Sequence, residues 1–167
     1  MKKVGIFYGS SSGTTETLAN DIAAQLGVAP GDVHNVASAD VATAESYEAL
    51  LLGSSTWGFG DLQDDWEGFL PKLAGANLAG KVVALFGCGD SSSYADTFCD
   101  ALAEIKDQLL GTGCTFVGAV APEDYEYDSS RSEEDGKLIG CCIDEMNQSD
   151  LTAERIERWL VEVKKSL

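Results

Sequence analysis

The chain has 167 residues, 44% of them hydrophobic, and its 28 acidic residues outnumber 11 Lys and Arg residues to give a net charge of −17. The hydrophobic content excludes a disordered chain, and the length suits one domain, so we expect residues 1-167 to form a single unit. The negative charge disfavours nucleic acid and anionic membranes as partners. No apolar run is long enough to span a membrane, and Met1-Lys2-Lys3 is unlike a signal peptide, so we expect a cytoplasmic protein.

The cysteines and the single histidine do not predict a metal site. No Cys-x-x-Cys pair occurs, and an odd number of cysteines is typical of reduced, buried thiols in a reducing compartment. His34 is expected on a short strand without ligand partners, as an ordinary polar residue. The five cysteines are Cys88, Cys99, Cys114, Cys141 and Cys142.

Short apolar runs alternate with helical spacings along the chain. The runs, which are typical of parallel strands buried on both faces, are Val4–Tyr8, Val33–Ala37, Ala49–Gly53, Val82–Phe86 and Thr115–Val120. Helical spacing is seen in four sets: Leu18, Ile22 and Leu26; Trp66, Phe69, Leu70 and Leu73; Phe98, Leu102, Ile105 and Leu109; and Ile156, Trp159, Leu160 and Val163, with Thr152 as N-cap. The alternation predicts an α/β fold, a doubly wound five-stranded parallel sheet in a three-layer α/β/α sandwich, with ligands at the carboxyl ends of the strands.

The loop after the first strand indicates a phosphate site. Gly9 and Gly13 permit tight turns, and five hydroxyl residues surround the start of the following helix, whose N–H groups and dipole favour an anion. The lysine of a nucleoside-triphosphatase loop and the third glycine of a dinucleotide fingerprint are missing. A simple helix cap remains the alternative. The hydroxyl residues are Ser10, Ser11, Ser12, Thr14 and Thr15.

Together with that loop, three further motifs in the same order resemble the flavodoxins over essentially the whole chain. They are Gly53-Ser54-Ser55-Thr56-Trp57-Gly58-Phe59-Gly60-Asp61-Leu62, Phe86-Gly87-Cys88-Gly89-Asp90 with Tyr94, and Ile143-Asp144-Glu145-Met146-Asn147-Gln148. The resemblance implies strand order 2-1-3-4-5, a topology for which flavodoxin is itself the standard example. It implies the long-chain type, with residues 121–140 inserted in the last strand and Leu138–Ile143 resuming it. A disordered linker is the alternative for that stretch.

The same resemblance implies a function. Flavodoxins are low-potential one-electron carriers, not enzymes; they bind flavin mononucleotide (FMN) non-covalently and cycle between semiquinone and hydroquinone while shuttling electrons between redox proteins. Two other classes remain open. A signalling receiver needs an aspartate at the end of the third strand, where Ser54-Ser55-Thr56 stand, and a quinone reductase needs a substrate cavity beside the flavin, often at a dimer interface.

Carried over to this chain, the resemblance implies four overlapping groups of cofactor-binding residues. The phosphate would be held by neutral donors at Ser10, Ser11, Ser12, Gly13, Thr14 and Thr15. Trp57 and Tyr94 would sandwich the ring, because a flat apolar surface is well matched by aromatic walls. The ring loop would be Ser55, Thr56, Trp57, Gly58, Phe59 and Gly60, with the peptide after Gly58 turning its carbonyl toward the reduced ring. The pyrimidine edge would lie against Gly87, Gly89 and Asp90, with Asp90, Ser91 and Thr97 as nearby donors and acceptors and Cys88 beside the ring. Met146 departs from the acid that relatives often carry near the ribityl chain.

Acidic residues gather in the same segments and predict the kind of partner. If they surround the ring, they attract redox proteins with basic docking surfaces and disfavour the anionic reduced flavin. Solubility alone is the alternative role. We expect the carrier to be a monomer. The acids are Asp61, Asp64, Asp65, Glu67, Asp90, Asp96, Asp100, Asp144 and Glu145.

Overall fold

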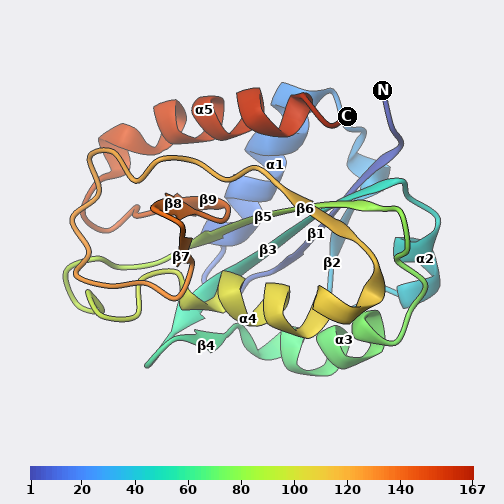
Figure 1. The fold of residues 1–167 in the computed structure, drawn as a ribbon, viewed down its shortest axis with the longest axis horizontal. Helices are drawn as coiled ribbons and strands as arrows, with labels where there is room; N and C mark the ends of the chain where they lie inside the picture. The colour runs from blue at the N-terminus through green and yellow to red at the C-terminus, as the bar shows by residue number, and fades with distance from the viewer.

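The computed structural model describes all of residues 1–167 and shows a parallel sheet between two layers of helices (Figure 1). The strands lie in the order β2-β1-β3-β5-β6, with β4 pairing antiparallel to β3, so the expected order of the five parallel strands is confirmed. Their bounds are β1 (Val4–Gly9), β2 (Val33–Asn35), β3 (Ala49–Trp57), β4 (Asp61–Leu62), β5 (Val82–Cys88) and β6 (Thr115–Val117).

The last position of the sheet is shared by two segments. β6 pairs with the first half of β5, and β9 (Cys141–Ile143) pairs with the second half, from Phe86 to Cys88. Between them, β7 (Glu133–Glu134) and β8 (Lys137–Leu138) form a separate antiparallel pair. Leu138 therefore lies outside the main sheet, and the resumed strand is shorter than the expected Leu138–Ile143.

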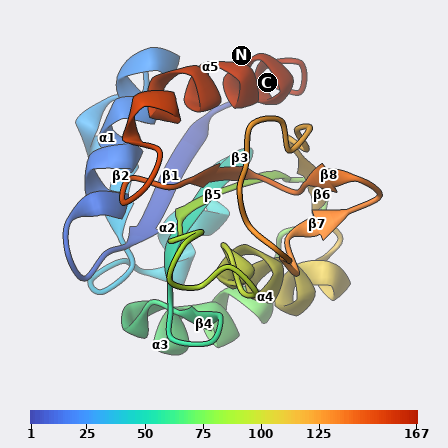
Figure 2. The same ribbon diagram turned by 90° about the vertical axis from the view of Figure 1, so that its left-hand side faces the viewer.

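Helices α1 (Thr14–Leu26) and α5 (Thr152–Lys164) cover one face of the sheet, and α3 (Asp64–Ala74) and α4 (Asp100–Leu109) cover the other (Figures 1 and 2). The short helix α2 (Val41–Glu45) lies near the edge formed by β2. Three single-turn 3-10 helices complete the chain, at Pro30–Asp32, Leu110–Thr112 and Ser149–Leu151.

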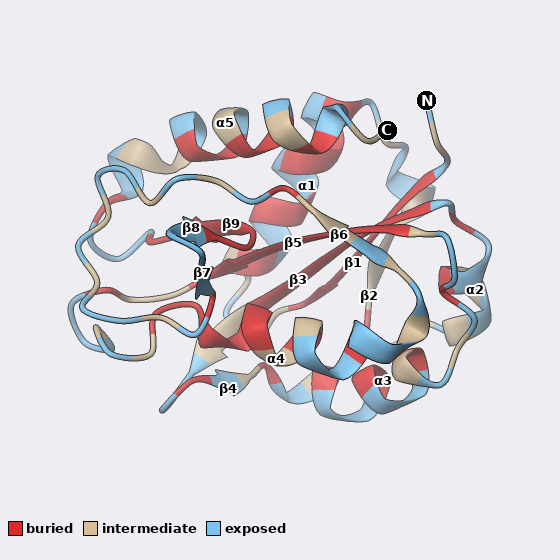
Figure 3. Cartoon of the chain, in the orientation of Figure 1, coloured by how far each residue is buried: buried red, intermediate tan, exposed pale blue.

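The central strands are buried along most of their length (Figure 3). Successive side chains of a strand point to opposite faces of the sheet and so enter different cores. Ile6 and Leu51 pack in the core under α1 and α5. Phe7, Leu50 and Leu52 pack in the core under α3 and α4. This explains why the strands are continuous apolar runs rather than alternating ones.

Two helix starts differ from the sequence-based expectation. Phe98 is buried but precedes α4, because Cys99 has a left-handed φ of 54° that separates it from the helix. Thr152 is the first residue of α5 rather than its N-cap, which is Leu151. The Thr152 hydroxyl instead donates a hydrogen bond to Glu145 Oε1 at 2.5 Å. Both helices were identified correctly, but their first turns were not.

Residues 118–140 are packed against the loop that follows β5. The backbone N–H groups of Asp128 and Ser129 donate to the carbonyl of Ala95 at 2.9 and 3.0 Å. The ring of Tyr127 stacks on Phe98, with centroids 5.2 Å apart and planes 11° apart. The segment therefore braces the carboxyl end of the sheet and is not a free linker.

His34 has a structural environment. Its ring stacks on Phe7 at 4.7 Å, and its Nε2 is hydrogen-bonded to the Tyr47 hydroxyl at 2.8 Å. That hydroxyl donates to Asp32 at 2.8 Å, and burial with the Asp32 contact raises the pKa of Tyr47 to about 12. No cluster of three or more His, Cys, Asp or Glu side chains is arranged to hold a metal ion, and no helix is both long and apolar enough to cross a membrane.

Candidate functional site

Three loops meet at the carboxyl end of the sheet, which faces the viewer in Figure 2. They are residues 10–13 after β1, residues 58–60 between β3 and β4, and residues 89–99 after β5. Since β1, β3 and β5 are parallel and β3 lies between the other two, the ends of these strands are brought to one rim. The rim is the place where the sequence predicts a ligand.

The first loop ends in a helix start without a side-chain cap. Gly13 is the N-cap of α1, has a φ of 93° and makes no capping hydrogen bond. In contrast, Asp40 caps α2 and Gln63 caps α3 through their side chains. The first N–H groups of α1 therefore have no partner from the helix or from a cap, and they point out of its N-terminus.

Hydroxyl groups surround this helix end. Ser10 Oγ accepts the N–H of Gly13 at 3.0 Å, which leaves the Ser10 hydrogen for another acceptor. Ser11 and Ser12 are exposed and Thr14 is half-buried. A groove of about 460 Å³ opens beside the loop and is lined on its other side by residues such as Glu145. The arrangement offers an anion N–H and O–H donors without a positive side chain.

Thr15 differs from its neighbours in the loop. Its side chain is buried, and its hydroxyl donates to Cys88 Sγ at 3.7 Å, so the group that it offers at the helix end is its backbone N–H. Burial raises the pKa of Cys88 to about 12. Cys88 is therefore a neutral packing thiol at physiological pH, as the sequence suggested.

Two half-exposed aromatic side chains stand on the other two loops. Trp57 and Tyr94 are each 44% exposed, although most large apolar side chains of the protein are buried. Trp57 Nε1 donates to Ser55 Oγ at 2.8 Å, and Tyr94 is held through its N–H, which donates to the carbonyl of Asp90 at 3.0 Å. Such rings provide apolar faces for a flat ligand.

The hairpin after β3 depends on two glycines. Gly58 and Gly60 have φ values of 52° and 98°, and the turn is closed by the N–H of Gly60, which donates to the carbonyl of Trp57 at 3.1 Å. A Cβ on Gly60 would lie 2.9 Å from Asp100, so this position has no room for a side chain. Phe59 lies between them and is 91% exposed. The left-handed backbone at both positions is the conformation that glycine adopts without steric cost.

The hairpin is also held by the first turn of α4. Thr56 Oγ1 accepts the N–H of Ala101 at 3.2 Å, which ties the end of β3 to the first turn of α4. Asp100, in the same turn, is buried and accepts the N–H of Arg131 at 2.8 Å. Burial raises the pKa of Asp100 despite that hydrogen bond. Asp100 is therefore a structural acid beneath the hairpin and not one of the exposed acids that were expected around the ring.

The third loop begins later than the sequence suggests. Gly87 and Cys88 are residues of β5, paired with β3 on one side and β9 on the other. A Cβ on Gly87 would lie 2.2 Å from the carbonyl oxygen of Ser54, so strand packing alone requires this glycine. The N–H of Gly89 donates to the carbonyl of Ile143 at 2.9 Å. Of the residues expected to bind the cofactor here, Gly89, Asp90, Tyr94 and Thr97 therefore lie in the loop itself.

Asp90 forms the turn that carries Tyr94. Its carboxylate accepts the N–H groups of Ser92 and Ser93 at 3.0 Å each, and it also accepts Asn147 Nδ2 at 2.8 Å. These hydrogen bonds, first of all the one from Ser93, hold the pKa of Asp90 below its usual value. The side chain thus stabilises the loop in its ionised form.

Asp144 is a second anchor of this loop. The sequence placed it among exposed acids, but it is fully buried. It accepts the N–H of Ser91 at 3.3 Å together with the Ser91 hydroxyl, and it accepts the N–H of Asn147 at 3.1 Å. Its role is to join the loop after β5 to the loop after β9. No local sequence signal distinguishes such a buried carboxylate from the surface acids around it.

These features define a class: a doubly wound α/β protein whose rim combines an uncapped helix N-terminus with half-exposed aromatic walls. The flavodoxin family model matches residues 6–159. The chain is 43% identical to Flavodoxin 1 of Escherichia coli strain K12, covering 100% of this chain and 96% of that protein, and 39% identical to the flavodoxin of Nostoc sp., covering 98% and 96%. A crystal structure of Fusobacterium nucleatum flavodoxin bound to flavin mononucleotide is similar, with a TM-score of 0.90 and 32% identity over 100% of this chain and 99% of that one. The chain belongs to the flavodoxin family.

Proposed function

We propose that this flavodoxin is a low-potential electron carrier that holds FMN non-covalently at the rim and passes single electrons between larger redox proteins. The proposal depends on the uncapped N-terminus of α1 at the same rim as the half-exposed rings of Trp57 and Tyr94. The relatives that are named flavodoxins, and the similar Fusobacterium nucleatum structure with bound FMN, support the same cofactor.

The residues at the first loop fit the phosphate group of FMN. The unpaired N–H groups at the start of α1 and the hydroxyls of Ser10, Ser11, Ser12 and Thr14 would donate to it, and Gly13 leaves space because nothing lies within 4 Å of its Cβ position. Thr15 would contribute its backbone N–H. Neutral donors of this kind bind an anion through the helix dipole and directed hydrogen bonds.

The residues at the other two loops fit the ring. Trp57 and Tyr94 would stack on its faces, and the loop backbones at 58–60 and 89–97 would meet its polar edges. FMN, when bound, supplies the one-electron chemistry; the chain positions it and keeps an edge open to partners. Gly58 would permit the peptide after it to present either an N–H or a carbonyl to the ring.

The packed segment 118–140 supports assignment to the long-chain type in a single domain. It lies between two strands that share one position of the sheet, and the chain aligns with nearly all of the Escherichia coli protein. The free cysteines, four of them buried, favour a reducing compartment such as the cytoplasm.

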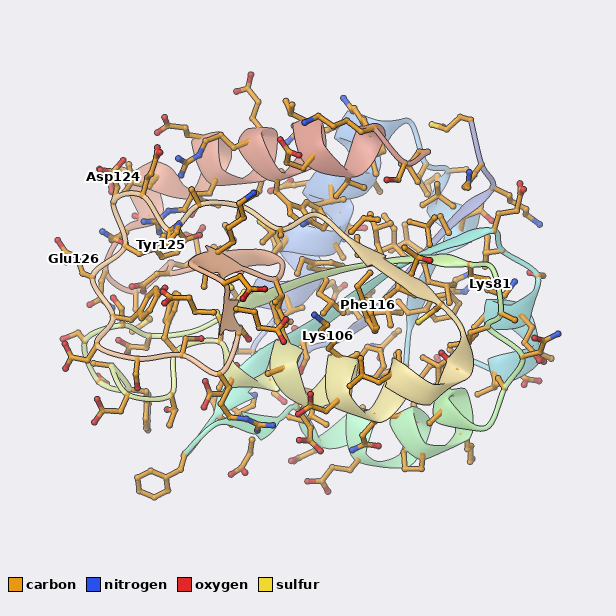
Figure 4. All side chains as sticks on the ribbon, in the orientation of Figure 1. Lys81, Lys106, Phe116, Asp124, Tyr125 and Glu126 are labelled. Carbon is orange, nitrogen blue, oxygen red and sulfur yellow. The ribbon has the colours of Figure 1, made fainter.

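The charge distribution supports partners with basic docking surfaces. Asp124 and Glu126 lie at the rim end of the molecule, whereas Lys81 lies at the opposite end (Figure 4). Lys81 donates to the backbone carbonyls of Glu45 and Tyr47. Lys106 lies over the ring of Phe116. A monomer with an acidic rim would meet such partners by electrostatic attraction.

FMN binding by the purified chain tests the proposal. We expect the fluorescence of FMN to be quenched on titration with the flavin-free protein, with an end point of one FMN per chain. We also expect no steady turnover of a quinone with reduced nicotinamide nucleotides. Unquenched FMN would refute the carrier, and rapid quinone turnover by the loaded protein would favour the enzyme class instead.

A further inference from the structure

Gln63 lies where the first two loops of the rim meet. It follows β4 directly, serves as the N-cap of α3, and is only 2% exposed. Glutamine is not among the residues that are usually preferred at this cap position. Its side chain extends from the hairpin side of the site to the loop after β1.

The orientation of the Gln63 amide is fixed by its hydrogen bonds. Oε1 accepts the backbone N–H of Asp65 at 3.0 Å, and a backbone N–H can only donate, so the other terminal atom must be nitrogen. Nε2 donates its two hydrogens to Ser11 Oγ at 3.1 Å and to Asp65 Oδ2 at 2.8 Å. The backbone N–H of Gln63 donates to Ser54 Oγ at 3.2 Å. Every polar hydrogen of this buried residue is used.

Close packing keeps the bridge in place. A Cβ on Gly9, the last residue of β1, would lie 2.2 Å from Gln63 Oε1 and 2.7 Å from Trp66 Cδ1. Trp66 is itself fixed, because its Nε1 donates to the carbonyl of Gly53 at 2.7 Å. The glutamine amide therefore touches the floor of the first loop and cannot easily move away from it.

We propose that Gln63 couples the two halves of the site, so that an anion on the first loop and a flavin ring at the hairpin each strengthen the binding of the other. This inference rests on the proposed function. Gln63 itself contacts neither ligand group; it is a positioning residue that acts through Ser11 and through the hairpin.

The hydrogen-bond direction gives the physical reason. Because Ser11 Oγ accepts the amide N–H, the Ser11 hydrogen is left to donate to an anion, and a donor chain from amide to hydroxyl to anion polarises each of its bonds. An anion bound through Ser11 would therefore strengthen the hydrogen bonds of the already fixed Gln63 bridge, which is joined to the hairpin through Leu62, the partner of Thr56. Thermodynamic linkage requires the effect to be reciprocal.

Riboflavin and inorganic phosphate separate the two halves of FMN and allow the coupling to be measured. We would titrate the flavin-free full chain with riboflavin, by fluorescence quenching, without phosphate and with saturating phosphate. In the parent chain, phosphate should raise riboflavin affinity by about fivefold or more, which is the lower end of common coupling between sites. Gln63→Met should bring that ratio close to one.

Two further variants make the test specific. Ser11→Ala removes the same hydrogen bond from its other end, and combining it with Gln63→Met should have no additional effect on the ratio. This variant also keeps the test decisive if Gln63→Met does not fold. Gln108→Met is the matched control, because Gln108 is exposed on α4 and bonds to Glu104, so it should retain the parent ratio.

The outcomes distinguish this inference from the proposed function. The measured ratio is the riboflavin affinity with phosphate divided by the affinity without it. A parent-like ratio in Gln63→Met or in Ser11→Ala would show that the bridge is only structural, and a ratio of one in the parent chain would also overturn the coupling. In either case, FMN binding by the parent chain would leave the carrier proposal intact. A parent chain that binds neither FMN nor riboflavin would overturn both. A ratio lost in the two variants and kept in Gln108→Met supports the coupling.

Discussion

Replacing Gly58 by valine and, in parallel, by asparagine tests the left-handed backbone of the hairpin that faces the proposed ring. Gly58 has a φ of 52°, and a Cβ there would lie 3.0 Å from Asp61 Oδ2, the end of an exposed side chain that can move away. Backbone strain is therefore the main cost. For residues with a Cβ, this conformation costs about 1–2 kcal/mol, whereas asparagine adopts it more readily.

Because that strain acts on the loop that carries Trp57, it should reduce ligand affinity. A loss of about 1–2 kcal/mol corresponds to a factor of about 5–30 in an equilibrium constant, so Gly58→Val should bind FMN weaker by about that factor. Gly58→Asn should stay closer to the parent. Valine should also reduce the amount of one-electron-reduced flavin that accumulates during a reductive titration, because it hinders rotation of the peptide after residue 58.

Fluorescence titration with FMN measures the affinities, and chemical unfolding of the flavin-free variants checks that each is folded. The reasoning depends on the order parent, asparagine, valine. If valine and asparagine weaken FMN binding equally, a side chain at this position matters but its left-handed backbone does not. If neither changes the affinity, Gly58 is an ordinary turn residue.

Three other expectations follow from the site. Alanine in place of Trp57 or Tyr94 should weaken FMN binding several-fold, since aromatic pairing contributes about 0.5–1.5 kcal/mol beyond buried area, and should brighten the bound flavin; unchanged fluorescence in both would contradict the sandwich. The double variant Asp64→Lys, Glu67→Lys should associate with a basic redox partner more slowly than the parent chain at low salt. The difference between the two association rates should shrink above about 0.1 M salt, where the screening length is roughly 10 Å; a difference that does not depend on salt would exclude electrostatic attraction as its cause. The pKa of Asp90 is lowered from 3.8, so its carboxylate stabilises the Tyr94 loop above pH 3.8, and this stabilisation is lost as the pH falls through the lowered pKa. Hydrogen exchange of the loop amides should therefore accelerate only in acid. Faster exchange already near neutral pH, or the same acid-induced acceleration in Asp90→Asn, would contradict this role.

The parallel sheet could be predicted because its evidence is local. Runs such as Val82–Phe86 are apolar at every position only when both faces are covered, and that burial is observed. The three loops could be predicted for the same reason, since in a parallel sheet the residues after each strand meet at one rim. Trp57 and Tyr94 were expected at this rim from the family resemblance, and both are half-exposed there.

The supports of the site could not be predicted from the sequence. Gln63 contacts Ser11 across 52 positions, and Asp144 contacts Ser91 across 53, so neither contact leaves a periodic signal in its own segment. Phe98 fits the helical spacing of α4 because its ring is buried with that helix, although Cys99 interrupts the backbone. Side-chain spacing reports burial; it does not report where a helix begins.

Whether this flavodoxin carries single electrons on FMN can be measured by a reductive titration of the FMN-loaded chain, followed by visible absorption. We expect one FMN per chain, two separate one-electron steps, and long-wavelength absorption from the one-electron-reduced flavin between them. A single two-electron bleaching step without that absorption, at the potential of free FMN, would contradict the claim.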